Sequence, residues 1–210
     1  MTGLLTRFAR STGAGPAAEF ALVLPLILIF LLGIIDVGRF AWELNRAEKA
    51  TQTGARWAAA TNIIASGLAG YSFATGVDQI PAGTAVPTSA FPGISCSSNG
   101  TTATCSYLGT CNGTCNFPTT ADNDAFTALI DRMADIKPDI TAANVIVDYR
   151  NSGLGFAGDP NGPDVAPIIS VRLRDLDFVP LTLMLFRGTI DLPDFSYSLT
   201  MEDGAGSWSN

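Results

Sequence analysis

The feature that most constrains this chain is the segment Phe20–Ile35, sixteen residues that carry no charge (FALVLPLILIFLLGII). Glu19 comes directly before it and Asp36 directly after it. A membrane-spanning helix needs about 20 largely apolar residues, and the segment reaches this length when a few neighbours and both acids are counted at its ends. Apolar side chains would cover every side of such a helix, which fits lipid better than burial in a protein core. The sequence therefore predicts a membrane helix.

Charge is distributed unevenly along the 210 residues. Residues 1–56 hold six Lys/Arg and four Asp/Glu, a net +2, whereas the remaining 154 hold six and fifteen, a net −9. An acidic region without a basic stripe argues against nucleic acid as a partner. The chain has no histidine, which removes the commonest general base and the commonest zinc ligand. We therefore expect a protein that is not an enzyme and that holds neither a cofactor nor a metal.

The residues around the apolar segment predict its orientation. Arg7 and Arg10 precede it, and no acid occurs before Glu19. Lys and Arg beside a span tend to stay in the cytoplasm, so the N-terminus should be cytoplasmic and the rest of the chain extracytoplasmic. A signal peptidase site would need small residues just after the apolar run. The bulky DVGRFAWEL stands there instead, which predicts a single-pass anchor that stays attached.

The four cysteines would then lie in an oxidising compartment, where disulfides are the natural expectation. Asn99-Gly100 is a hairpin signal. A two-residue turn there would place Cys96 opposite Ala103, so a bridge from Cys96 to Cys105 needs a longer or shifted loop. We expect sequence-local pairing of Cys96 with Cys105. The same reasoning pairs Cys111 with Cys115, although the Cys-x3-Cys spacing of this second pair is also compatible with zinc.

The predicted fold class is α+β: a long N-terminal transmembrane α-helix, then a small extracytoplasmic domain with one or more helices and an antiparallel sheet. Amphipathic periodicity predicts a helix over 121–136, and alternation predicts strands over 145–150, 168–178 and 195–201. These elements divide the chain into a cytoplasmic leader (1–14), a transmembrane and extended helix (15–68), a Ser/Thr/Gly/Cys-rich loop region (69–120) and an α+β extracytoplasmic domain (121–210).

Several features leave two interpretations open. A stripe of mostly small residues from Phe40 to Ala58 could pack in a filament or on the chain's own domain, and for Trp57 and Ala58 we expect the latter. The apolar segment 179–186 (VPLTLMLF) is too short to span, so it packs in the core or touches the bilayer surface. Asp36 and Arg39 are three residues apart and could pair on one helix face. Asp159, Asn161 and Asp164 could hold Ca²⁺, but a plain turn is the favoured interpretation.

One combination of residues is more specific. It comprises a small-residue patch, Glu19-Phe20, an apolar helix with an early Leu24-Pro25, and the run Gly54 to Ala58. In this combination, over roughly residues 13–60, the chain resembles the TadE-like pilus-assembly family, the pseudopilins of tight-adherence (Flp-type) secretion systems. The remainder of the chain agrees more loosely.

The resemblance implies processing by a membrane-embedded prepilin peptidase, which cuts on the cytoplasmic side and leaves the helix attached. Because the family's glutamate is the fifth residue of the mature chain, Glu19 places the cut between Ala14 and Gly15. The family's usual residue before the cut is glycine, and Pro16 would be an unusual second residue. The cut therefore tolerates alanine, shifts by one residue, or does not occur in this chain.

The resemblance also implies a role for Glu19 in subunit docking, by pairing with the freed amine of a neighbouring subunit. A carboxylate at the head of a helix is in any case stabilised by the macrodipole, so a helix-capping role explains it equally well. The implied function is a pseudopilin-like component in the assembly of a tight-adherence pilus or secretion machine. The implied setting is the bacterial inner membrane, with other pilus-assembly proteins and pseudopilins as partners. The alternative is a membrane-tethered extracytoplasmic binding or adhesion module outside any pilus.

Overall fold

The computed structural model describes residues 15–111, 113, 115–160, 162–184 and 187–201, and every structural statement below refers to these residues. They form two compact units. The first, which we call the anchor unit, contains the described residues up to Glu43 together with Phe178–Ile190. The second, which we call the sheet unit, contains Leu44–Asp177 and the described residues from Asp191 onward.

The longest element is helix α2 (Gly15–Ala60), which contributes residues to both units and continues through Pro25. The sequence predicted a helix as far as residue 68, but α2 ends at Ala60 and only the short helix α3 (Ser66–Ala69) follows. The reason is tertiary. Ile64 is buried, and its backbone N–H donates a 3.1 Å hydrogen bond to the hydroxyl of Tyr149 in the sheet, a contact that a continued helix would not make.

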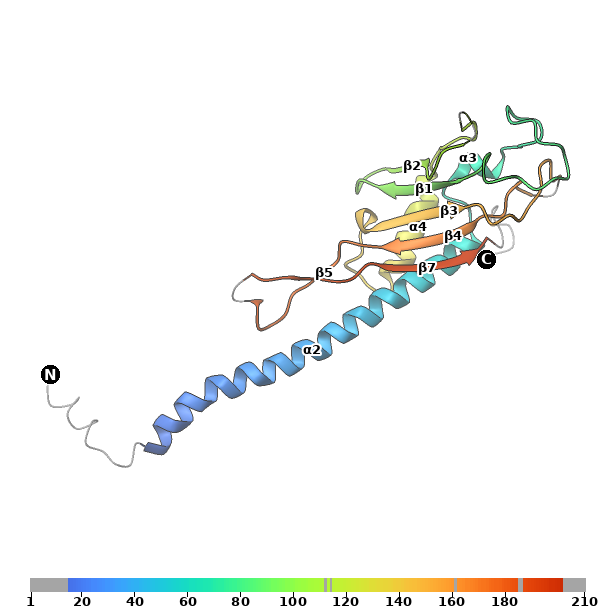
Figure 1. Cartoon of the computed structure of the whole chain (residues 1–210). Coiled ribbons are helices and arrows are strands. Elements are labelled where there is room, and N and C mark those ends of the chain that lie inside the picture. Colours follow the sequence, from blue (N-terminus) through green and yellow to red (C-terminus); the bar gives the residue numbers. More distant parts are fainter. Residues whose placement is uncertain (1–14, 112, 114, 161, 185–186, 202–210) are drawn as a thin grey trace. The chain divides into compact units, whose positions relative to one another are not determined.

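A five-stranded antiparallel sheet is the centre of the sheet unit, in the order β2-β1-β3-β4-β7 (Figure 1). The strands are β1 (Gly93–Ser98), β2 (Ala103–Tyr107), β3 (Val145–Arg150), β4 (Ile168–Leu173) and β7 (Phe195–Thr200). Strand β3 lies in the middle of the sheet, and nearly all its side chains are buried. Strand β7 lies at the edge and alternates between half-buried and exposed residues. The long helix followed by helices and an antiparallel sheet confirms the predicted α+β class.

Helix α4 (Asn123–Ala134) supplies much of the core against this sheet. Asp122 begins it as a cap, because its carboxylate accepts hydrogen bonds from the N–H groups of Asp124 and Ala125. Its apolar face buries Phe126, Leu129 and Met133. The short 3-10 helix η2 (Ala142–Asn144) then leads into β3. Figure 1 shows α4 and the C-terminal part of α2 on one side of the sheet.

The two helices approach each other closely at Gly54 of α2. A Cβ atom built on this glycine would lie 2.7 Å from the sulfur of Met133 and 3.4 Å from a methyl carbon of Leu129. Arg46, which precedes Gly54 on α2, makes a second contact with the segment that follows α4. Its guanidinium donates hydrogen bonds of 2.9 and 2.6 Å to the carbonyl of Ile136. The missing side chain at Gly54 therefore allows the two helices to pack.

The predicted strand over 168–178 is interrupted in the structure. Strand β4 ends at Leu173, and Asp175 adopts a positive φ of 55° that breaks the extended run. The chain resumes as β5 (Asp177–Phe178), which pairs with β6 (Ile190–Asp191) in a separate two-stranded sheet. The described residues between these two short strands, 179–184 and 187–189, therefore lie outside the five-stranded sheet.

The hairpin between β1 and β2 resolves the register question raised by the sequence. Its loop is longer than two residues: the side chain of Asn99 accepts hydrogen bonds from the N–H groups of Thr101 and Thr102, and Ala103 pairs with Ser98. Cys96 therefore faces Cys105 and is joined to it by a disulfide. A second disulfide joins Cys111 to Cys115. Both bridges have the sequence-local pairing, and no described cysteine is free.

Candidate functional site

The head of α2 contains the residues that the family resemblance singled out. Gly15 is the first described residue and begins the helix, and Ala14, on the other side of the expected cut, lies outside the described residues. Glu19 is one turn further on, and its side chain is exposed to the surroundings. A carboxylate in this position is open to a second molecule, and it lies beyond the first turn of α2, which contains no acid.

The helix that follows exposes its apolar residues on all sides. Every large apolar side chain from Phe20 to Ile35 is exposed, from 37% at Leu24 to 79% at Leu22. Only 6% of the most apolar 18-residue window of α2 is buried, and the helix is long and apolar enough to cross a membrane. In water this surface would be a large unfavourable apolar patch. This arrangement is consistent with a single-pass anchor.

Asp36, at the end of the uncharged run, is the most constrained polar group of the anchor unit. Its side chain is only 9% exposed, and it binds the loop that returns to the helix far along the chain. One carboxylate oxygen accepts the N–H of Leu181 at 2.7 Å, and the other accepts the N–H and the hydroxyl of Thr182 at 2.9 and 2.8 Å. Three donors from one loop thus converge on a single carboxylate of α2.

Arg39 extends this contact by one helical turn. Its guanidinium lies 3.3 Å from the Asp36 carboxylate and 3.4 Å from the carbonyl oxygen of Val179. It also stacks over the ring of Phe178, 5.2 Å from the centroid, while Phe40 meets the same ring edge-on at 5.4 Å. The Asp36–Arg39 pair predicted from its spacing is present. Together these contacts hold residues 178–182 against one face of the helix.

The stripe of small residues in α2 packs on the chain's own domain from Ala47 onward. Ala47, Thr51, Ala55 and Ala58 are all buried within the sheet unit. Trp57 is only partly covered, because it remains 38% exposed while it lines a groove with residues of the chain's own helix α4. The part of the stripe beyond Ala47 is therefore occupied and unavailable as a filament contact.

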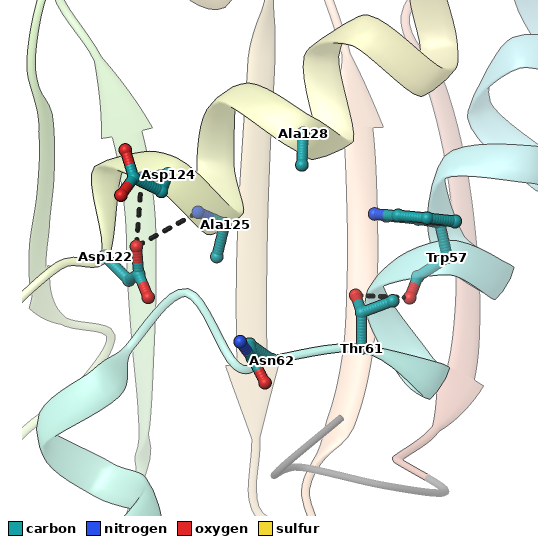
Figure 2. Close-up of a pocket in the computed structure, with 7 residues that line it drawn as sticks. All are labelled: Trp57, Thr61, Asn62, Asp122, Asp124, Ala125 and Ala128. Atoms are coloured by element: carbon teal, nitrogen blue, oxygen red, sulfur yellow. Dashed lines mark hydrogen bonds between the residues drawn. The ribbon is translucent and has the colours of Figure 1, made fainter. Parts of the chain in front are cut away.

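Trp57 lies at the edge of a groove with a volume of about 440 Å³ between the end of α2 and the start of α4 (Figure 2). Two of the polar side chains that line this groove, those of Asp122 and Thr61, make hydrogen bonds to nearby backbone groups. The Asp122 carboxylate caps α4, and the hydroxyl of Thr61 donates to the carbonyl of Trp57 at 2.8 Å (Figure 2). Asp122 thus contributes a helix cap, and Asp124 lies in the first turn of α4.

The loop considered for Ca²⁺ is organised by its own backbone. Asp164 is buried, and its two oxygens accept the N–H groups of Phe73 at 2.6 Å and Asp159 at 3.1 Å. Asn161 lies outside the described residues. Among the residues that the structure describes, no three His, Cys, Asp or Glu side chains are grouped as metal ligands would be.

The contact between Asp36 and Thr182 could not be derived from the sequence. The two residues are 146 positions apart, and no periodicity links a residue in the middle of a helix to a distant loop. Two separate signals did point to them: an acid directly after the uncharged run, and an apolar segment of eight residues too short to span. Joining these signals required the tertiary structure.

Comparison with known families identifies residues 17–56 as a match to the family model described as TadE-like protein. The match begins two residues before Glu19 and ends two residues beyond Gly54, so it covers the exposed run and most of α2. It confirms the resemblance drawn from the sequence over this segment. Neither the curated proteins nor the solved structures contain a match to the chain.

Proposed function

The chain carries a TadE-like segment, which associates it in general terms with tight-adherence pilus machinery, and from this premise we propose that it is a membrane-anchored, pseudopilin-like component of pilus or secretion-machine assembly. The observation that carries the proposal is the coincidence of the family match with the exposed apolar helix. Residues 17–56 include every exposed apolar side chain from Phe20 to Ile35. The segment that matches the family model is therefore also the segment whose exposed apolar surface suits lipid, which supports the proposal.

We propose the bacterial inner membrane as the location, with the N-terminus in the cytoplasm and the sheet unit in the periplasm. Arg7 and Arg10 support this orientation by the positive-inside rule. The two disulfides support it independently, because disulfides persist in the periplasm and are rare in the cytosol. The proposed partners are other pilus-assembly proteins and pseudopilins.

Glu19 is proposed to dock a neighbouring subunit. Cleavage between Ala14 and Gly15 would create an amine at the mature N-terminus, and a carboxylate near hydrocarbon is costly until it is paired. The pairing of one subunit's amine with another subunit's Glu19 would neutralise both charges in the membrane. In this proposal the prepilin peptidase is a transient partner of the chain, and the role of the protein is structural rather than enzymatic.

The test is the intact mass of the protein purified from envelope membranes, with and without the system's prepilin peptidase. We expect the mass of the leader (residues 1–14) to be lost only when the peptidase is present. Glu19→Gln should still be cleaved but should no longer co-fractionate with pili, and Glu43→Gln is the matched control on the same helix. A leader that is retained in the presence of the peptidase, and a protein that never co-fractionates with pili, would support a membrane-tethered binding module instead.

A further inference from the structure

The described residues 178–184 and 187–190 of the anchor unit, which we call the anchor loop, have an unusual surface. Val179 is 47% exposed, Leu181 39% and Met184 66%. Water-soluble proteins rarely collect large apolar side chains on one exposed loop without a partner for them. We therefore expect these side chains to contact something other than water.

The hydrogen bonds of Asp36 determine which part of α2 the anchor loop accompanies. Because Leu181 and Thr182 donate to the Asp36 carboxylate at 2.7–2.9 Å, they lie at the same level along the helix axis as Asp36. The groove beside them is lined from the helix by Gly33, which lies within the uncharged run one turn before Asp36, and from the loop by Leu183. The groove between the loop and the helix thus extends into the uncharged segment.

That level coincides with the expected boundary of the bilayer. The sixteen uncharged residues before Asp36 make a helix about 24 Å long at about 1.5 Å per residue, shorter than the hydrocarbon thickness of about 30 Å. The hydrocarbon must therefore extend to one or both flanking acids. A lone carboxylate there is costly, and the three donors of the anchor loop meet its hydrogen-bonding needs.

We propose that the anchor loop inserts into the outer-leaflet interface of the membrane, with Val179, Leu181 and Met184 in contact with lipid acyl chains. The groove between the loop and α2 has a volume of about 460 Å³. The groove is lined by apolar side chains apart from Asp36 and Thr182, whose polar atoms bond each other. The loop thereby forms a second membrane contact, which begins 142 residues after Asp36 in the sequence. This contact holds the outer end of the uncharged run at a defined depth in the membrane.

Lipid is favoured over a second copy of the chain because of the position of this surface. The loop is attached at Asp36, beside a stretch of α2 where Ile34, Ile35 and Val37 are 56%, 49% and 71% exposed. At that depth lipid surrounds the helix by default, and a protein partner would first have to displace it. The inference rests on the proposed insertion of α2 in a bilayer, which the experiment tests separately.

The experiment uses nitroxide labels on single introduced cysteines in the full chain, reconstituted in vesicles of phosphatidylethanolamine and phosphatidylglycerol. Collisions with oxygen report a hydrocarbon environment, and collisions with a water-soluble nickel chelate report water. Met184→Cys is the test site. Leu28→Cys, within the apolar run, tests insertion of α2, and Leu154→Cys, 58% exposed in the sheet unit, is the aqueous control. Counting one free thiol per chain verifies that the native disulfides remain intact.

We expect the label at position 184 to lose nickel collisions and gain oxygen collisions, as at position 28 and unlike position 154. Asp36→Ala in the Met184→Cys chain should restore nickel collisions, because the loop loses its attachment. A water-like label at 184 beside a lipid-like label at 28 would overturn the inference while α2 remains an anchor. Protection at 184 from both reagents would also overturn it, by showing that protein covers the loop. A water-like label at position 28 would overturn the anchor itself.

Discussion

Tyr149 illustrates how much one side chain of the sheet unit determines. It is fully buried on β3, and its hydroxyl accepts the N–H of Ile64, where the chain turns after α2. Burial raises the pKa of this tyrosine well above its ordinary value of 10.0, because the ionised form would lose its hydration. Tyr149 therefore helps to fix the path of the chain after α2, and it is also a titratable group whose pKa depends on folding.

A pH dependence follows from this shift. In the unfolded chain Tyr149 ionises near its ordinary pKa, whereas in the folded chain it remains protonated, so the unfolded state binds fewer protons above pH 10. Its contribution to stability is complete below pH 10 and declines as the pH rises above that value. We expect the free energy of unfolding, measured by denaturant titration in mild detergent, to fall less steeply between pH 10 and about 11.5 in Tyr149→Phe than in the parent chain.

The same substitution has a separate cost at neutral pH. Tyr149→Phe leaves the Ile64 N–H buried without its acceptor, and such a loss typically costs about 1–3 kcal/mol. Tyr107→Phe is the control for the removal of a tyrosine hydroxyl, because Tyr107 is 42% exposed whereas Tyr149 is fully buried. Equal alkaline slopes for the parent chain and Tyr149→Phe would contradict the assignment.

At the scale of elements, the packing of α2 on α4 depends on a missing side chain. Gly54 is unfavourable for a helix by about 1 kcal/mol relative to alanine, and it is retained where Met133 approaches most closely. Helix propensity and tertiary packing therefore act in opposite directions at this position. The sign of a substitution at Gly54 depends on which of the two dominates.

We expect Gly54→Ala to destabilise the chain by about 1–3 kcal/mol, because overpacking a buried contact outweighs the propensity gain. In a Met133→Ala background, which has already lost stability through a cavity, the same substitution should instead stabilise the protein by up to about 1 kcal/mol. A double-mutant cycle in urea gives the coupling directly. Additive effects of the two substitutions would show that the helices do not meet at Gly54 in solution.

The molecule as a whole consists of an anchor unit and a sheet unit joined through α2 and through the short strands β5 and β6. Each unit has its own chemistry. The anchor unit exposes apolar side chains over most of its helix. The sheet unit buries an apolar core beneath its sheet, and the edge strand β7 of that sheet has exposed serines. This division predicts that the two units occupy different media.

Labelling with a membrane-impermeant maleimide tests the arrangement in intact spheroplasts. We expect Leu154→Cys to react from outside because it is exposed in the sheet unit. Ser11→Cys in the N-terminal tail should react only after lysis, in cells that lack the prepilin peptidase and so retain the tail. Labelling of position 11 without lysis, or failure to label position 154, would reverse the proposed orientation.

Local patterns determined much of this protein without the structure. The uncharged run, the amphipathic spacing of residues 121–136 and the alternation in 145–150 each predicted the correct element, because 3.6- and 2-residue periods reflect which side chains face a core. Periodicity marks neither the end of α2 nor the break after β4. Those were set by the burial of Ile64 against Tyr149 and by the positive φ of Asp175.

The sequence alone therefore determined the apolar helix with Glu19 at its head and the α+β class, whereas it only favoured the sequence-local disulfides. Composition, periodicity and spacing are local properties, which a single sequence displays directly. The tertiary structure decided that Cys96 faces Cys105 across a longer loop, that Gly54 admits Met133, and that the anchor loop binds Asp36. These contacts join residues through space, and their energies depend on burial and geometry that arise only when the chain has folded.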